Sequence, residues 1–138
     1  MRIFSCANSF TMMEIMITLV IIGVLAVLGF SQYESINEKV KGQDAINSLQ
    51  LVYTAERIYR GENPTYGTCL NTADCNTLLN LELSSMEWNY SVAGAADSFV
   101  STATRSGGQA AYNAKTIVMT YDPSVSPDPS WSGTWPFL

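Results

Sequence analysis

A single carboxylate interrupts the first apolar segment of this chain. Glu14 is the only charged residue in the run from Phe10 to Phe30. Because an ionised group at mid-membrane costs about 2.5 to 3.5 kcal/mol, such groups are usually paired and functional. Thr11 and Glu14 also have the spacing of a capping box, in which Glu14 would fold back on the first turn of a helix. Pairing with an external positive charge and local capping are both open, and one does not exclude the other.

Two cysteines predict a disulfide on the far side of a membrane. Cys69 and Cys75 lie in a polar stretch beyond the apolar run, whereas Cys6 precedes it. A disulfide between them closes a loop of about seven residues and is worth about 2 kcal/mol. A metal site or a redox dithiol is the alternative, but the pair is not a C-x-x-C motif and has no histidine partner.

Residue types limit the remaining chemistry. The chain contains no histidine, which removes the usual Ser-His and Cys-His nucleophile pairs and histidine-ligated metal sites. We therefore assign no catalysis and expect no cofactor. Asp122 and Asp128 supply oxygen atoms for calcium, but their spacing matches no defined calcium loop, and a proline-rigidified surface turn is the alternative.

Four aromatic residues could stack on a sugar or a base, but aromatics in a small sheet more often lie in the core. We expect the core for all four: Trp88, Tyr90, Trp131 and Trp135.

Composition is typical of a small exported protein that is anchored in a membrane. The chain has 138 residues, of which 47% are hydrophobic and 14% charged, and its formal net charge is -5. An acidic surface opposes nonspecific binding to nucleic acid, whose phosphates attract basic patches. We therefore expect no nucleic-acid partner.

The apolar run is long enough to cross a bilayer. Its length of about 21 residues corresponds to about 31 Å of helix, and Arg2 before it predicts a cytoplasmic N-terminus. A secretory signal is an alternative, but the small-residue cleavage pattern that should follow the apolar run is poor. A lipoprotein signal would need a cysteine after the run, and Cys6 lies before it.

The helical pattern continues beyond the apolar run. The first clear stop is Gly61-Glu-Asn-Pro64, so we expect helix from about Phe10 to Arg60, about 75 Å long. Its later apolar residues lie on two sides, one for the chain's own globular domain and one for a neighbouring subunit. One side has Tyr33, Ile36, Val40, Leu51, Ala55 and Ile58, and the other has Ile46, Leu49, Tyr53 and Tyr59.

Two further features of this helix can be read from spacing. Glu56 and Arg60 are four residues apart, which is the spacing of an ion pair on one helix face. A coiled coil is the alternative use of such a helix, but two drifting apolar stripes without sustained heptads fit it poorly.

The last part of the chain predicts an antiparallel sheet. Three β-rich runs, 87–93, 98–105 and 116–121, are separated by turn signals. Trp131 and Trp135 either cover the edge of this sheet or belong to a short fourth strand. A sheet of this size is marginal alone, so we expect it to pack on the second half of the long helix. The predicted fold class is α+β.

The N-terminal residues resemble a known family. Ser9-Phe-Thr-Met-Met-Glu14, an apolar run broken by Gly23, and then Gln32-Tyr33 are similar to the class III prepilin signal of type IV pilins and type II secretion pseudopilins. The resemblance extends over about 50 residues, and its implied architecture is the α+β fold predicted above.

This resemblance implies a life cycle for the chain. A prepilin peptidase would cut between Ser9 and Phe10, and the new amino terminus of Phe10 would be N-methylated. Glu14 would then meet the Phe10 ammonium of a neighbouring subunit as a helical homo-oligomeric filament grows. Two unit charges about 4 Å apart attract by about 4 kcal/mol at an effective dielectric near 20. The implied location is the bacterial inner membrane before assembly, and a periplasmic or extracellular filament after it.

Gly23 and Gly29 are the expected sites of local helix melting, because glycine lowers helix propensity by up to about 1 kcal/mol relative to alanine.

These inferences divide the chain into five segments. The segments are a leader (1–9), a transmembrane and polymerisation helix (10–30), its amphipathic second half (31–61), a loop region with the disulfide (62–86), and the sheet with the C-terminal region (87–138).

Two rival interpretations stay open. Ser9 stands where the family has glycine, so the first rival is an uncleaved membrane anchor that carries a periplasmic or surface binding domain. The second rival is a minor pilin with an adhesive or DNA-uptake role. A surface pilus and a secretion pseudopilus share every feature given above.

Overall fold

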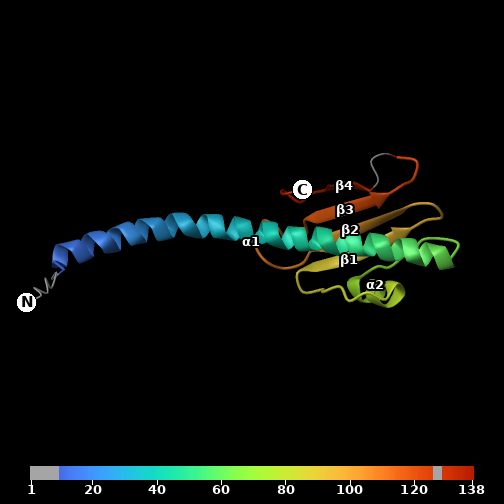
Figure 1. The fold of residues 1–138 in the computed structure, drawn as a ribbon, viewed down its shortest axis with the longest axis horizontal. Helices are drawn as coiled ribbons and strands as arrows, with labels where there is room; N and C mark the ends of the chain where they lie inside the picture. Colours follow the sequence, from blue (N-terminus) through green and yellow to red (C-terminus); the bar gives the residue numbers. More distant parts are fainter. Residues whose placement is uncertain (1–9, 126–128) are drawn as a thin grey trace, which may run out of the picture. The chain divides into compact units, whose positions relative to one another are not determined.

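The protein is an α+β structure, as predicted. The computed structural model describes residues 10–125 and 129–138. The elements in chain order are α1 (Met12–Glu62), α2 (Thr72–Leu79), β1 (Trp88–Gly94), β2 (Phe99–Arg105), β3 (Thr116–Tyr121) and β4 (Ser130–Gly133) (Figure 1). The chain divides into two compact units after Glu38.

Helix α1 has 51 residues, and its two ends follow ordinary capping rules. At its start the hydroxyl of Thr11 accepts a hydrogen bond from the backbone N–H of Glu14 at 3.2 Å. At its end the side-chain amide of Asn63 donates to the carbonyl of Tyr59 at 3.0 Å, and Pro64 follows. The predicted bounds, Phe10 to Arg60, therefore differ from the observed helix by two residues at each end.

The sheet is a four-stranded antiparallel meander in the order β1-β2-β3-β4. Side chains alternate between its two faces, so residues opposite each other share a face. Tyr90 lies opposite Ala103, and Ala103 lies opposite Ile117; all three are buried. The three predicted strands are confirmed to within one residue at their ends.

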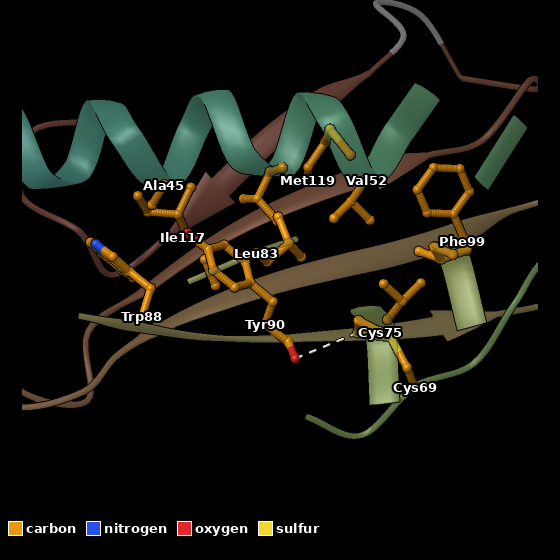
Figure 2. Packing of buried hydrophobic residues seen from close by; sticks show 14 of the residues in the cluster. Ala45, Val52, Cys69, Cys75, Leu83, Trp88, Tyr90, Phe99, Ile117 and Met119 are labelled. Atoms are coloured by element: carbon orange, nitrogen blue, oxygen red, sulfur yellow. Dashed lines mark hydrogen bonds between the residues drawn. A yellow bond between two sulfur atoms is a disulfide. The ribbon is translucent and has the colours of Figure 1, made fainter. Parts of the chain in front are cut away.

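The second half of α1 covers this buried face. Ala45, Leu49 and Val52 are fully buried and belong to one core cluster with Phe99 and Met119 of the sheet (Figure 2). The expectation that the sheet packs on the second half of the helix is confirmed. The other predicted stripe is exposed, with Val40, Leu51 and Ile58 each more than half accessible to solvent.

The expected pairing of Glu56 with Arg60 is wrong. Glu56 is fully buried, and its Oε2 accepts the backbone N–H of Gly67 at 2.8 Å. Arg60 instead donates to the carbonyl of Ala96 at 3.0 Å and lies 3.7 Å from the carboxylate of Asp97. The helix wheel places Glu56 on the side that the globular unit buries, where a backbone donor replaces the arginine.

Helix α2 lies in the segment that the sequence analysis treated as a loop. Asn71 caps it by accepting the N–H of Asp74 at 2.9 Å, and Asn80 ends it in the left-handed conformation with φ of 51°. Cys75 of α2 forms the predicted disulfide with Cys69. This helix was missed because its eight residues are too few for a clear apolar period, although both caps are visible in the sequence.

The aromatic residues near the C-terminus join the core, as expected. Trp131 lies in the fourth strand, and Trp135 is 4% exposed, with its ring centroid 4.9 Å from that of Trp88. Trp135 packs so closely on Gly42 of α1 that a Cβ there would lie 2.3 Å from its Nε1 atom. Gly42 therefore allows helix and C-terminal segment to meet.

A buried arginine of β2, which no pattern in the sequence indicated, belongs to a cluster that links the start of the sheet to α1. Arg105 is 1% exposed and donates to the carbonyl of Glu87 at 2.7 Å, and it also pairs with the carboxylate of Glu87. Lys41 of α1 lies 3.3 Å from that carboxylate, and Trp88 donates its Nε1–H to the carbonyl of Lys41 at 3.0 Å. The cluster orients the helix against the start of the sheet.

Candidate assembly site on the first helix

The N-terminal unit exposes apolar side chains on every side of α1. The apolar part of this helix is not buried, and the helix is long and apolar enough to cross a membrane. Helix geometry needs no tertiary partner, but this much exposed apolar surface is unstable in water. The larger exposed residues are Met12, Met13, Ile15, Met16, Ile17, Leu19, Val20, Ile21, Ile22, Val24, Leu25, Val27 and Leu28.

Glu14 interrupts this surface in the first turn of the helix. Its backbone N–H is capped by Thr11, but its carboxylate forms no hydrogen bond or ion pair with any residue in 10–125 or 129–138. The capping box is therefore half formed: the Thr11 side chain accepts the N–H of Glu14, but the Glu14 side chain does not accept a backbone N–H from any described residue in return. An exposed carboxylate in an apolar surface is available to a cation from outside the chain.

Other polar side chains in this segment are satisfied locally. The hydroxyl of Thr18 donates to the carbonyl of Ile15 at 2.8 Å, which is the usual way for a helix to carry threonine in an apolar environment. Phe10, just before the helix, is 73% exposed. Ser9 and the rest of the predicted leader, 1–9, lie outside the described residues, so cleavage and N-methylation stay predictions.

The glycines leave room for a neighbouring helix. A Cβ added at Gly23 or Gly29 would meet nothing within 4 Å. Gly23 forms part of a shallow apolar hollow of about 420 Å³ with Val20, Val24, Val27 and Leu28, and small residues let helices approach closely in membranes. The helix is continuous through both glycines, and their melting in an assembled state stays a prediction.

A second apolar surface belongs to the globular unit. A groove of about 440 Å³ lies between the end of α1 and the segment around the end of α2. The predicted exposed stripe supplies one wall through Leu51, Ala55 and Ile58, and residues 78–81 supply the other. This groove could not be predicted from the sequence, because one of its walls lies around the end of α2, a helix too short to show a clear apolar period.

The disulfide anchors this second wall. The N–H and carbonyl of Cys69 pair with the carbonyl and N–H of Val92, both at 2.9 Å, and Sγ of Cys75 lies 3.6 Å from the carbonyl oxygen of Tyr90 (Figure 2). Cys69 and Cys75 thus hold the start of α2 beside the edge of β1.

Of the two residues that could bind calcium, Asp122 lies in the described part of the chain. Asp122 accepts hydrogen bonds from the N–H and hydroxyl of Ser124 at 2.9 and 2.6 Å, and these bonds lower the pKa of its carboxyl. Asp128 lies outside the described residues. Within the part of the chain that the structure describes, no three His, Cys, Asp or Glu residues are grouped to hold a metal.

Taken together, these features are a pilin-like architecture: a long N-terminal helix, apolar in its first part, whose second part packs on a four-stranded antiparallel sheet, with one disulfide. Comparison with protein families, curated proteins and solved structures gives no match to this chain. The assignment of class therefore rests on the fold and on the N-terminal residues.

Proposed function

We propose that this chain is the structural subunit of a helical filament, either a type IV pilus or a type II secretion pseudopilus. The filament forms through the N-terminal helix after a prepilin peptidase cleaves before Phe10. The observation that carries the proposal is the exposed apolar part of α1, with the carboxylate of Glu14 as its single charge and without a partner among the described residues.

The apolar surface supports two successive environments. In the inner membrane, lipid covers the side chains between Phe10 and Phe30. In the filament, the same side chains of other copies replace lipid, so little apolar surface meets water during the transfer. Within the N-terminal unit these side chains are exposed, whereas Ala45, Leu49 and Val52 belong to the core of the second unit.

Glu14 supplies the register of assembly. A cleaved chain carries an ammonium group at Phe10, and this cation on a neighbouring copy neutralises Glu14. At about 4 Å and an effective dielectric near 20, the attraction is about 4 kcal/mol, which corresponds to about a thousandfold in an association constant. A copy added in the wrong register leaves the carboxylate unpaired in an apolar environment.

We assign no catalysis to this chain. Its partners before polymerisation are the assembly machinery and the membrane. The groove beside Leu51 and Ile58 is a further surface for a neighbouring subunit, because it continues the exposed stripe of α1.

The test is a set of Glu14 variants expressed with the assembly machinery. Glu14→Gln has nearly the same shape without the charge, and we expect it to insert and to be processed but to reduce sheared fibre yield at least about tenfold. Glu34→Gln removes an exposed carboxylate from the same helix beyond the apolar segment, and we expect normal yield. Normal fibre yield from Glu14→Gln would refute the pairing role.

Mass spectrometry of the native protein distinguishes the rivals. A chain that begins at N-methylated Phe10 and carries the disulfide supports the proposal. A chain that begins at Met1 supports the uncleaved anchor instead. Pili that persist in normal number after deletion of this chain would assign it to a minor subunit.

A further inference from the structure

The face of the sheet opposite α1 has an unusual composition. Side-chain alternation places eleven residues of the four strands on it, and none of them is buried. Seven carry hydroxyl groups, three are aliphatic, one is the amide Asn89, and none is charged or aromatic. We call this surface the hydroxyl face, and it consists of Asn89, Ser91, Ala93, Val100, Thr102, Thr104, Thr116, Val118, Thr120, Ser130 and Ser132. The amide oxygen of Asn89 accepts hydrogen bonds from the N–H and hydroxyl of Thr72 at 3.2 and 2.9 Å.

The register aligns these residues in rows that cross the whole sheet. One row runs from Ser91 through Thr102 and Val118 to Ser132. A parallel row contains Ala93, Val100, Thr120 and Ser130, and a third contains Asn89, Thr104 and Thr116. Neighbouring strands lie about 4.8 Å apart, so the rows form a regular array of short, uncharged side chains, in which hydroxyl and methyl groups predominate.

Most of these hydroxyls are not used within the chain. Ser130 donates to the carbonyl of Thr120 at 3.4 Å, and the hydroxyl of Thr116 lies 3.3 Å from that of Thr134. Within residues 10–125 and 129–138, the side chains of Ser91, Thr102, Thr104 and Ser132 form no hydrogen bond to another protein group. These hydroxyls therefore have donors and acceptors to offer.

The charge of the protein lies elsewhere. The chain has twelve acidic and seven basic residues, and the one charged residue within the four strands, Arg105, is buried on the other face. Two copies of an acidic protein repel each other on most approaches. The hydroxyl face is an approach on which no like charges oppose each other.

We propose that the hydroxyl face is a self-association surface, on which a copy in one filament packs against a copy in another. This proposal rests on the filament function. Each hydroxyl is both a donor and an acceptor, so two such faces are complementary to each other. In the globular unit, α1 and its exposed stripe lie opposite this face, so subunit contacts through α1 leave the hydroxyl face uncovered.

The size of the face explains why association needs filaments. Four strands about 4.8 Å apart and a strand length of about 20 Å give a contact of about 300 Å² per copy. A stable protein interface buries about 800 Å² per partner. A single pair of copies is therefore held weakly, whereas many copies aligned along two filaments act together.

A neutral glycan is the other partner that an uncharged face would fit. The structure favours a second copy, because the face has no aromatic side chain to provide a stacking platform. The aromatic residues of the strands, such as Trp88, Tyr90 and Phe99, are buried on the opposite side.

The test uses purified filaments of the full chain, without added polymer, at about 20 mM and about 500 mM salt. Salt screens the general repulsion between acidic copies, so we expect bundles in negative-stain microscopy and more pelleted material at the higher salt. Thr102→Glu and Thr102→Lys place like charges at the centre of two opposed faces. We expect each to lower the bundled fraction about tenfold or more at high salt.

Matched controls separate the face from net charge. Ser85→Glu and Ser85→Lys make the same changes in charge at an exposed loop position, and we expect bundling to fall slightly with glutamate and to rise slightly with lysine. If Thr102→Lys increases bundling and Thr102→Glu decreases it, bundling follows the net charge and not the hydroxyl face. That result would overturn the proposal. Ser132→Lys, at an exposed edge position, gives the same test if Thr102 variants fold poorly.

The remaining outcomes are also decisive. Filaments of the unmodified chain that stay single at both salt concentrations overturn this inference alone. Single filaments that are retained on a neutral glucan resin, and lose retention in Thr102→Lys, assign the face to a glycan instead. Absence of filaments from the unmodified chain overturns the proposed function and this inference with it.

Discussion

Two parts of helix α1 differ in what surrounds their apolar side chains. Between Met12 and Leu28 the large apolar residues are exposed on every side. Between Lys39 and Glu62, by contrast, Ala45, Leu49 and Val52 are fully buried beneath the sheet. Both parts are regular helix, so helix formation itself does not reveal which one is stabilised by the chain's own fold.

The two carboxylates on these parts show the same contrast. Glu14 is exposed and lacks a side-chain partner among the described residues, whereas Glu56 is fully buried and accepts the N–H of Gly67. The carboxylate of Glu14 is therefore accessible from outside the chain. The carboxylate of Glu56 is enclosed, with Oε2 bonded to Gly67 and Oε1 buried without a hydrogen-bond partner among the described residues.

Paired leucine truncations test this contrast most strongly. We expect Leu49→Ala to lower the free energy of unfolding by about 3 kcal/mol, because it removes buried methyl groups and leaves a cavity. Leu25→Ala, at a position that is 63% exposed, should change it by less than about 0.5 kcal/mol. Urea unfolding of the full chain in mild detergent, followed by tryptophan fluorescence, reports the globular unit, which contains all three tryptophans.

Equal losses from the two leucine variants would contradict the division of the helix into an uncovered and a covered part.

Removal of the disulfide sharpens the comparison. We expect Cys69→Ser with Cys75→Ser to lower the unfolding free energy by about 2 kcal/mol, the chain-entropy value for a loop of this length. Amide hydrogen exchange should quicken over Thr72–Leu79 and stay unchanged in the N-terminal part of α1. Cys6→Ser is the control and should leave stability unchanged; a similar loss from Cys6→Ser would show that thiol chemistry elsewhere is responsible.

The smallest expected effect is the pH dependence at Glu56. Burial raises the pKa of this carboxyl above its ordinary value of 4.5, and the hydrogen bond from Gly67 opposes the rise. The folded state therefore holds the proton at pH values where the unfolded state has released it. The contribution of Glu56 to the free energy of unfolding therefore falls as the pH rises from about 4.5 towards the folded-state pKa of this carboxyl. Above that pKa the contribution no longer changes.

Glu56→Gln keeps an oxygen for the N–H of Gly67 and removes the titration. We expect its unfolding midpoint to be higher than that of the unmodified chain at neutral pH and to converge with it at acidic pH. Glu34→Gln, at an exposed position of the same helix, should leave the pH profile unchanged. A Glu56→Gln profile parallel to that of the unmodified chain would contradict the assignment.

Much of the architecture could be predicted from local patterns. The long apolar run, the stop at Gly61–Pro64 and the β-rich runs each carry a periodicity or a turn signal that acts over a few residues. Cys69 and Cys75 were predicted to pair because they are the two cysteines beyond the apolar run, on the side of the membrane where disulfides form. The exposed stripe with Leu51 and Ile58 was one of the two sides expected from the helix wheel.

Other features depend on contacts between distant residues. From the sequence, Arg105 would be expected to be a polar residue at the end of a strand. Its burial is tolerated because the carboxylate of Glu87 and the ring of Trp88 lie beside its guanidinium group. Helix α2 is too short to be stable alone and depends on the disulfide and the edge of β1. The hydroxyl face could be identified only from the register of the strands, because spacing within one strand does not show which residues of the next strand lie beside it.

The sequence by itself determined where helix and strands form, which segment can enter a membrane, and where a lone acid interrupts it, since these properties depend on neighbours along the chain. Only the tertiary structure decided that Glu56 binds a backbone N–H rather than Arg60, that a groove lies beside Leu51, and that the sheet presents one uncharged face. The physical reason is that burial and register arise from segments far apart in sequence, whose packing no local pattern encodes.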